Sequence, residues 1–489
     1  MTGPTEDELP QAAFDQQEIQ GVIERVRLRL RGHAEVETVP RVDQGISAGD
    51  GIFPTIDEAI AAARSAFEAY RSKGLKKRHR IIDGARQAMR KRARELAEMA
   101  HLETGLGRAE DKVLKNLLVI EKTPGPEDLE PQVWSGDQGL TVTEFAPFGV
   151  IGAITPTTNP TATIINNAIA AVSAGNTVVF NAHPNAKRVS VQTIRWLNQA
   201  MMEAGGPPNL VTATPEPTIE SAQHLMNHPQ VRILLVTGGP GVVAEAQKTA
   251  KRSILAGPGN PPVVVDSTAD LELAGREIVR GASFDNNIIC VDEKVVFVVD
   301  SAADPLLQSL AAHGSYVLKQ HELTKLERVI FKDIGEPGRP GHVEPRWIGQ
   351  NASAILAEIG VRTGHDTRLA VADVPAEHCL VWTEQMMPVL PVVRTRTVDE
   401  AIDLAIRAEH GCGHTASIYS RDVNAITRMA RDIDVSIFVA NAAHLAGLGD
   451  GGEGHTSFSI ASPTGEGLTR PRSFSRERRM TVAGGLRIV

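Results

Sequence analysis

The sequence is poor in cysteine. Three cysteines occur among 489 residues, Cys290, Cys379 and Cys412, and no two of them form a Cys-x-x-Cys motif. An odd number at wide spacing favours neither a disulfide framework nor a zinc site, so no bound metal is expected. Thiols that stay free are typical of a reducing compartment, which favours the cytoplasm.

Long apolar runs are missing as well. No stretch reaches the roughly 18 apolar residues that a membrane helix needs. The first ten residues, MTGPTEDELP, are acidic and lack the apolar region of a signal peptide. We therefore expect neither secretion nor insertion into a membrane.

The chain also lacks an excess of basic charge. It has 51 lysines and arginines against 59 acidic residues, a net charge of −8. Nucleic-acid and anionic-membrane partners leave a strongly basic footprint on a protein, so both classes are disfavoured. The basic run Lys76–Arg80 opens a helical stretch, and we interpret it as a solvated face.

Organisation changes along the chain. At roughly 100 to 200 residues per domain, the length predicts two to four domains. Residues 54–122 have helical periodicity, and after them short β-branched runs such as GVIGAIT, TVVFN and KVVFVVD alternate with helical stretches. This alternation predicts βαβ units and parallel sheets, in two α/β domains. The last 35 or so residues are strand-like, rich in glycine and arginine, and typical of an arm that adds strands to another sheet.

The N-terminal segment differs from the rest. Ile19, Val22, Ile23 and Val26 recur at helical spacing among charged residues, which predicts a short amphipathic helix over residues 15–30. Residues 31–53 have the composition of a linker. A helix isolated in this way must bury its apolar stripe, either against its own domain or in a groove of another protein.

Three features could carry chemistry. Cys290 lies in a loop before a predicted strand, where a thiol can serve as a nucleophile, although a lone cysteine is more often a small core residue. Asn159 follows an apolar strand, where its amide can donate to an oxyanion or simply form a turn or helix cap. The turn at Gly238 and Gly239 precedes a helix and suits phosphate approach, but tight chain reversal is the common use of such glycines.

The order of several motifs resembles the aldehyde dehydrogenase superfamily over residues 54–489. These motifs are TPTTNP, GNTVVFNAHP, VTGGPG, LAGPGNPP, the loop cysteine, EQMMPVLPVV and HTASIYS. Within the superfamily, SFDNNIIC and GLGDGGEGHTSFSIASPTGEG resemble the CoA-acylating propionaldehyde and acetaldehyde dehydrogenases of bacterial microcompartments.

The resemblance implies a domain layout and two catalytic residues. An NAD-binding domain is expected over 54–123 and 144–256, a catalytic domain over 257–445, and a β-strand oligomerisation arm with the C-terminal segment over 124–143 and 446–489. Cys290 matches the nucleophile of the family. Asn159 matches the side chain that stabilises the oxyanion together with the Cys290 backbone amide.

The resemblance also implies the residues that bind NAD. Glu384 matches the acid that holds the nicotinamide ribose, Gly238 and Gly239 match the turn at the phosphates, and His183 stands where many relatives have a lysine at the adenosine ribose. An imidazole gives a weaker and pH-dependent contact there. The residues expected along the nicotinamide are Thr155, Pro156 and Thr157.

One departure from the family indicates the acyl acceptor. Hydrolytic relatives carry E-L-G-G-K-N-P, and alignment on Asn260 and Pro261 places Leu255 where their glutamate activates water. Without that base, a thiolate such as that of coenzyme A is the better attacker of a thioester. We expect CoA-acylating oxidation of a short aldehyde, with propanal as the favoured substrate. The alternatives are a hydrolytic enzyme that uses Glu384 or Asp292 as base, and a catalytically silent encapsulated scaffold.

The resemblance bears on partners as well. Microcompartment enzymes often carry an N-terminal amphipathic helix on a linker, so residues 1–53 are expected to direct the chain into a shell through residues 15–30. The strand-rich arm favours a dimer, or a tetramer of paired dimers.

Overall fold

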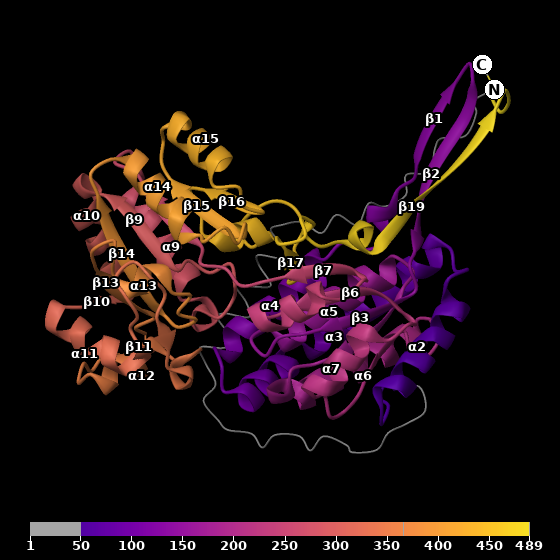
Figure 1. Cartoon of the computed structure of the whole chain (residues 1–489), viewed down its shortest axis with the longest axis horizontal. Coiled ribbons are helices and arrows are strands. Elements are labelled where there is room, and N and C mark those ends of the chain that lie inside the picture. The colour runs from indigo at the N-terminus through magenta and orange to yellow at the C-terminus, as the bar shows by residue number, and fades with distance from the viewer. Residues whose placement is uncertain (1–49, 365, 489) are drawn as a thin grey trace, which may run out of the picture. The chain divides into compact units, whose positions relative to one another are not determined.

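The computed structural model describes residues 50–364 and 366–488. The predicted helix over 15–30 and nearly all of the predicted linker lie outside this range. No helix in the described ranges combines the length and apolarity needed to cross a bilayer. The described residues contain two parallel sheets flanked by helices, so the predicted α/β fold class is confirmed (Figure 1).

The first sheet has five parallel strands. Its order is β5 (Val211–Ala213), β4 (Thr177–Asn181), β3 (Val150–Ile154), β6 (Val231–Thr237) and β7 (Arg252–Ala256). One face packs on α3 (Leu75–Thr104), α5 (Pro160–Ser173) and α6 (Lys187–Glu203). The other face packs on α2 (Ile56–Tyr70), α7 (Ile219–Asn227) and α8 (Pro240–Gln247). Helix α4 (Ala109–Lys122) packs against α3 and α5.

The second sheet has seven parallel strands. Its order is β10 (Ser315–Val317), β13 (Leu369–Asp373), β14 (Val389–Thr395), β9 (Val295–Val299), β8 (Pro262–Val265), β15 (Thr415–Tyr419) and β16 (Ile437–Ala440). One face packs on α9 (Leu271–Ala282) and α10 (Asp300–Ala312). The other packs on α11 (Gln320–Ile330), α12 (Ala352–Glu358), α13 (Cys379–Trp382), α14 (Val398–Ala408) and α15 (Val423–Asp432).

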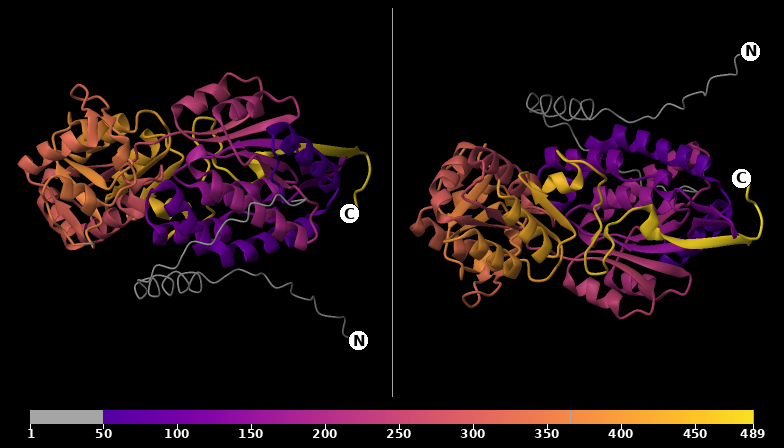
Figure 2. Two further views of the ribbon diagram at one scale, coloured as in Figure 1. Left: turned by 90° about the horizontal axis from the view of Figure 1, so that it is seen from below. Right: turned by 90° about the horizontal axis from the view of Figure 1, so that it is seen from above.

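A third, antiparallel sheet joins two distant parts of the chain. Strand β2 (Gly139–Pro147) pairs with β1 (Gln132–Gly136) on one side and with β19 (Ser475–Ala483) on the other. Figure 1 shows this sheet extending away from both parallel sheets, and both views of Figure 2 place β19 beyond the five-stranded sheet. The C-terminal segment thus adds its strand to a sheet of its own chain.

Helix α5 fixes the turn at the carboxyl end of β3. All 14 of its residues are buried, which fits an apolar sequence with no charged residue. Pro160 occupies its first turn, where the missing N–H costs nothing. The chain therefore leaves β3, turns at Asn159, and enters the core at once.

One sequence expectation about this region is wrong for a single residue. The basic run Lys76–Arg80 was expected to form a solvated face, and four of its residues are exposed or partly exposed, but Arg78 is buried. Its guanidinium donates to the backbone carbonyls of Lys73 and Ser173. Because Arg78 supplies donors to the Ser173 carbonyl at the end of α5 and to the Lys73 carbonyl just before α3, it acts as a structural residue of the first core.

Candidate functional site

A single cavity of about 630 Å³ collects every predicted site residue. These residues are Thr155, Pro156, Thr157, Asn159, His183, Gly238, Gly239, Cys290 and Glu384. Seven of them, all except Cys290 and Glu384, follow the carboxyl ends of β3, β4 and β6, which lie side by side in the first sheet. Ligands of parallel α/β sheets gather at this edge, because the connecting loops open there.

Asn159 does not act as a helix cap. It occupies the N-cap position of α5, but its side chain makes no capping hydrogen bond. Instead the Lys115 ammonium donates to Asn159 Oδ1 at 2.6 Å, and Asn159 Nδ2 donates to Thr158 Oγ1 at 3.2 Å. The amide is thereby held with its oxygen toward the protein interior, and the second hydrogen on Nδ2 has no acceptor among the described residues.

Cys290 is partly exposed and lines the same cavity. Burial, with a smaller contribution from the Glu384 carboxylate, raises the pKa of the thiol to about 12, and Lys294 opposes this only in part. The free site therefore holds a protonated thiol at neutral pH. A proton must leave Cys290 before the sulfur can attack a carbonyl.

Glu384 brings a carboxyl group into the cavity. Burial raises its pKa, while Lys294 and a hydrogen bond from the Gly259 backbone amide lower it in part. Gly259 has no room for a side chain, since a Cβ there would lie 3.1 Å from the Cys290 carbonyl oxygen and 3.0 Å from the His414 ring. Gly259 therefore packs against the backbone of Cys290, and its backbone amide holds the Glu384 carboxyl group in place.

His183 presents a defined tautomer to the cavity. The Asn185 backbone N–H donates to His183 Nδ1 at 3.2 Å, so Nε2 carries the proton of the neutral ring. Burial lowers the pKa of His183, which keeps the ring neutral near pH 7. His183 is therefore a neutral donor, where a lysine would bring a charge.

The residues present fit a dinucleotide. The hydroxyls of Thr155 and Thr157 are buried without a partner among the described residues, so the cavity wall holds unused polar groups. Gly239 precedes the first turn of α8, and a Cβ built there would meet no atom within 4 Å. The backbone amides of that turn are thus accessible to a phosphate.

Leu255 has no catalytic group and no access to the cavity. It is 2% exposed and lies in the apolar cluster formed by α2, α7 and α8 with the sheet. Of the two alternative bases, Glu384 lines the cavity and Asp292 does not. Asp292 accepts a hydrogen bond from the Ile289 backbone amide, and burial raises its pKa well above the usual range.

Sequence reasoning missed His414. It is fully buried, its Nδ1 lies 2.9 Å from Thr415 Oγ1, and its Nε2 has no partner within the described ranges. Burial lowers the pKa of His414 to about 4, so the ring is neutral, and it lies behind the cavity wall, against Gly259. The motif HTASIYS contains this residue, but burial against Gly259 cannot be read from the motif.

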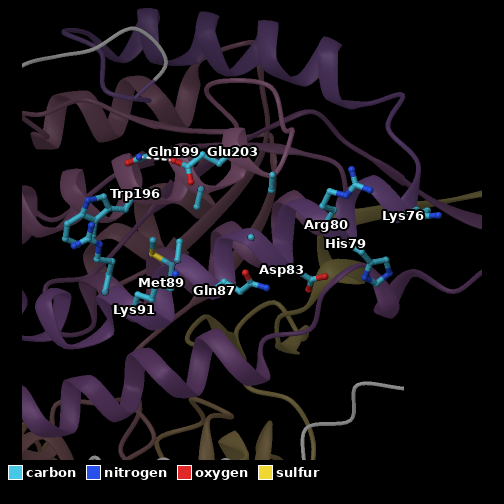
Figure 3. Close-up of a pocket in the computed structure, with 15 residues that line it drawn as sticks. Lys76, His79, Arg80, Asp83, Gln87, Met89, Lys91, Trp196, Gln199 and Glu203 are labelled. Carbon is cyan, nitrogen blue, oxygen red and sulfur yellow. Dashed lines mark hydrogen bonds between the residues drawn. The ribbon is translucent and has the colours of Figure 1, made fainter. Parts of the chain in front are cut away.

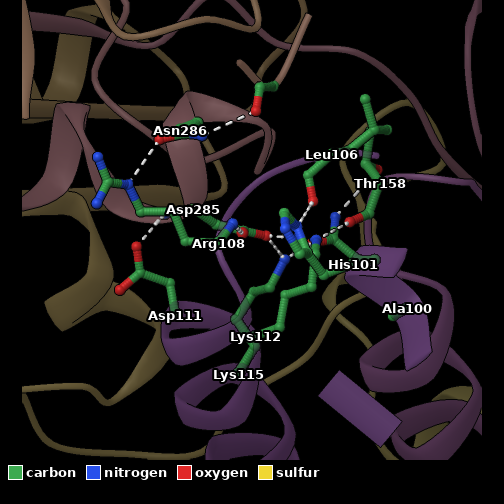
Figure 4. A network of polar contacts seen from close by, with 12 residues as sticks. Ala100, His101, Leu106, Arg108, Asp111, Lys112, Lys115, Thr158, Asp285 and Asn286 are labelled. Carbon is green, nitrogen blue, oxygen red and sulfur yellow. Dashed lines mark hydrogen bonds and ion pairs between the residues drawn. The ribbon is translucent and has the colours of Figure 1, made fainter. Parts of the chain in front are cut away.

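Sequence reasoning also missed a buried charge network behind Asn159. Lys112 and Lys115 of α4 both contact the Asp285 carboxylate, as Figure 4 shows. Two lysines three positions apart on a charged helix look like surface residues in the sequence. Their burial depends on where the loop that precedes Cys290 crosses α4.

Two other features lie apart from this site. A groove of about 990 Å³ between α3 and α6 contains none of the predicted site residues. Side chains labelled in Figure 3 along it are Lys76, His79, Arg80, Asp83, Gln87, Met89, Lys91, Trp196, Gln199 and Glu203. Asp57, His224 and His228 are the one group within the described ranges close enough to share a metal, and none of them lines the 630 Å³ cavity.

Comparison with known proteins identifies the family. The aldehyde dehydrogenase family model matches residues 50–324 and 366–462. This span is well over half of the chain. The chain therefore belongs to the aldehyde dehydrogenase family.

More specific relatives are acylating aldehyde dehydrogenases. The acetylating acetaldehyde dehydrogenase EutE of Salmonella typhimurium is 48% identical over 478 residues, covering 97% of this chain and 100% of that protein. The CoA-propanoylating propanal dehydrogenase of the same organism is 43% identical over 441 residues, covering 90% and 94%.

Solved structures show the same similarity. A propionaldehyde dehydrogenase of Rhodopseudomonas palustris, with bound CoA and an acylated cysteine, gives a TM-score of 0.87 at 45% identity and covers 90% of this chain and 100% of that chain. A propionaldehyde dehydrogenase from the fucose utilisation bacterial microcompartment of Clostridium phytofermentans gives 0.87 at 41% identity, with the same coverage. The predicted fold and family are both confirmed.

Proposed function

We propose that this protein oxidises a short-chain aldehyde and transfers the acyl group to coenzyme A, with NAD as the hydride acceptor. The observation that carries this proposal is the pairing of Cys290 and Asn159 in one cavity while Leu255 is buried in the core. The CoA-acylating relatives, and the structure with CoA and an acylated cysteine, support the same reaction.

The first half of the proposed reaction forms a thioester on Cys290. The Cys290 thiolate attacks the aldehyde carbonyl, and Asn159 Nδ2 with the Cys290 backbone N–H donates to the oxyanion that forms. A dinucleotide held in the cavity would supply the acceptor for the hydride. Loss of the hydride leaves the carbonyl carbon as a thioester on Cys290.

The second half of the reaction needs no base that activates water. The CoA thiolate attacks the thioester, the Cys290 thiolate leaves, and acyl-CoA is released. The balance is aldehyde, CoA thiol and NAD⁺ in, with acyl-CoA, NADH and one proton out. Thr155, Pro156, Thr157, His183, Gly238, Gly239 and Glu384 are the residues that would hold the dinucleotide.

CoA dependence tests this proposal. Turnover of propanal with NAD is measured with and without CoA, and rates for ethanal and butanal rank the substrates. We expect NADH formation to require CoA beyond a single turnover, with propanal preferred. Equal turnover without CoA would identify a hydrolytic enzyme, and absence of any turnover would identify a silent scaffold.

The parts of the chain take matching roles in this proposal. Residues 54–123 and 144–256 bind NAD, residues 257–445 carry the nucleophile, and residues 124–143 with 446–489 form the oligomerisation arm and the C-terminal segment. Through this arm the chains associate into a homodimer or a tetramer. The exposed strands β1 and β19 support this assignment, because both are edges of the three-stranded sheet.

Residues 1–53 direct the enzyme into a bacterial microcompartment in the cytoplasm, with residues 15–30 binding a shell protein. The apolar spacing of that segment and the microcompartment relative support this. Deletion of residues 1–40 should leave turnover unchanged and abolish co-purification with the shell. Retained encapsulation of the truncated chain would reject the role of this segment.

A further inference from the structure

Lys115 bridges two groups of the proposed site. Its ammonium donates to Asn159 Oδ1 at 2.6 Å and also pairs with Asp285 Oδ2. The side chain is 2% exposed, so the contacts are made away from bulk water. Asp285 precedes Cys290 in the same loop. One side chain of α4 therefore contacts both the loop of the nucleophile and the proposed oxyanion donor.

The Asp285 carboxylate is itself firmly held. The Arg108 backbone N–H donates to Asp285 Oδ1 at 2.6 Å, and Lys112 donates to Oδ2 at 2.9 Å. The Asp285 backbone N–H donates to Asp111 at 2.9 Å. Asp285 adopts φ 45°, and a Cβ at Gly107 would overlap its carboxylate, so glycine is required opposite it. The anchor for Lys115 is thus a fixed point (Figure 4).

Charge balance keeps this cluster polarised. Lys112 and Lys115 outweigh the effect of burial and hold the pKa of Asp285 below its usual range, while burial lowers the pKa of Lys112 to about 8. Two ammonium groups therefore share one carboxylate. The side-chain oxygen of Asn159 gives the Lys115 ammonium a second acceptor, in addition to the shared Asp285 carboxylate.

This arrangement permits only one orientation of the Asn159 amide. With Oδ1 toward Lys115, Nδ2 faces away from the ammonium and is available to the cavity. A flipped amide would place Nδ2 against the ammonium, so two donors would meet and a buried ammonium would lose its acceptor. The contact with Lys115 selects the orientation that oxyanion stabilisation requires.

We propose that Lys115 is a positioning residue that fixes the amide of Asn159 for oxyanion stabilisation, using Asp285 as its anchor. The inference rests on the proposed function, since it assumes that Asn159 donates to the oxyanion. Preorganised donors of this kind act because they need no reorientation during the reaction. Lys115 itself touches neither substrate nor cofactor in this account.

Lys112 provides a matched control. It lies on the same helix, contacts the same Asp285 oxygen and is equally buried at 2%. Toward the site it reaches the Thr158 carbonyl at 3.5 Å, and within the described ranges it makes no hydrogen bond to Asn159. Replacing either lysine removes one charge from the cluster, but only replacing Lys115 releases the amide.

A double-mutant cycle tests the proposal. Lys115→Met and Lys112→Met are each made alone and in the Asn159→Ala background, and kcat and KM are measured with aldehyde, NAD and CoA. Alone, Lys115→Met should lower kcat roughly 10- to 100-fold with little change in KM, because a misaligned donor is worth less than an aligned one. In the Asn159→Ala background it should lower kcat no further. Lys112→Met should have a smaller effect, of equal size in both backgrounds.

Other outcomes overturn the proposal. Equal losses from the two lysine variants, or a Lys115→Met loss that persists in the Asn159→Ala background, would show a merely structural role. Thermal unfolding checks that each variant is folded. If Lys115→Met does not fold, the same cycle is run with Lys115→Gln and Lys115→Arg, and equal losses in both backgrounds reject the proposal. Failure of the proposed function is distinct, since it would appear as CoA-independent turnover of the unmutated chain.

Discussion

The side-chain oxygen of Asn159 accepts from Lys115, and one of the two hydrogens on Nδ2 is used by Thr158. The other hydrogen is available to an oxyanion. Asn159→Ala should therefore lower kcat by about 10² to 10³ with little change in KM for the aldehyde, because the lost contact is made only in the transition state. Steady-state kinetics with propanal, NAD and CoA measure this. An unchanged kcat would show that Asn159 only shapes the turn.

Cys290 gives a pH prediction. Burial and the nearby Glu384 carboxylate disfavour the thiolate, so alkylation of the free enzyme by iodoacetamide should rise with pH from about pH 7 to about pH 10 without a plateau. Glu384→Gln removes one negative neighbour, which lowers the pKa of the thiol and speeds alkylation at every pH. A plateau near neutral pH in the unmutated enzyme would contradict the burial argument.

Residues of the cavity differ in how far sequence could identify them. Cys290 and Asn159 stand inside long ordered motifs, so the resemblance located them before any geometry was known. Lys115 and Asp285 carry no such signal, because a lysine on a charged helix reads as a surface residue. Their role depends on contact between α4 and the loop that precedes Cys290, which are far apart in the sequence.

At the scale of elements, the β-branched runs predicted eight strands of the two parallel sheets but not β7, β10, β13 or β14. Strand β14 shows most clearly why. This strand contains Pro391, and proline normally argues against a central strand because it cannot donate a ladder hydrogen bond. Nevertheless β14 pairs with β13 on one side and β9 on the other. Tertiary packing of its apolar side chains outweighs the missing donor, and no local pattern shows that.

The arm yields a prediction about assembly. Trp134 on β1 and Met480 on β19 are 50% and 59% exposed, and both lie on edge strands of the three-stranded sheet, where a second chain can pair. A Trp134→Ser/Met480→Ser variant should therefore form a smaller species by light scattering coupled to gel filtration. Val423→Ser, which replaces a residue of α15 that is 68% exposed and lies on no sheet edge, is the control. Identical masses for all three proteins would contradict the role of the arm.

At the scale of the whole molecule, the length alone predicted two to four domains. The structure has two parallel sheets, a cavity that collects the predicted site residues, and a strand-rich arm. The order of motifs predicted this layout, and the family comparison confirms the fold. The number of copies in the assembly is not encoded in any single motif, because it depends on how edges of separate chains meet.

The central claim is that a thioester on Cys290 is handed to coenzyme A. Intact-protein mass spectrometry after incubation with propanal and NAD, without CoA, tests it most directly. We predict a propanoyl adduct that maps to Cys290, is absent from Cys290→Ala, and disappears on addition of CoA as propanoyl-CoA forms. An adduct that hydrolyses as fast in water as it reacts with CoA, or no adduct at Cys290, would contradict the account.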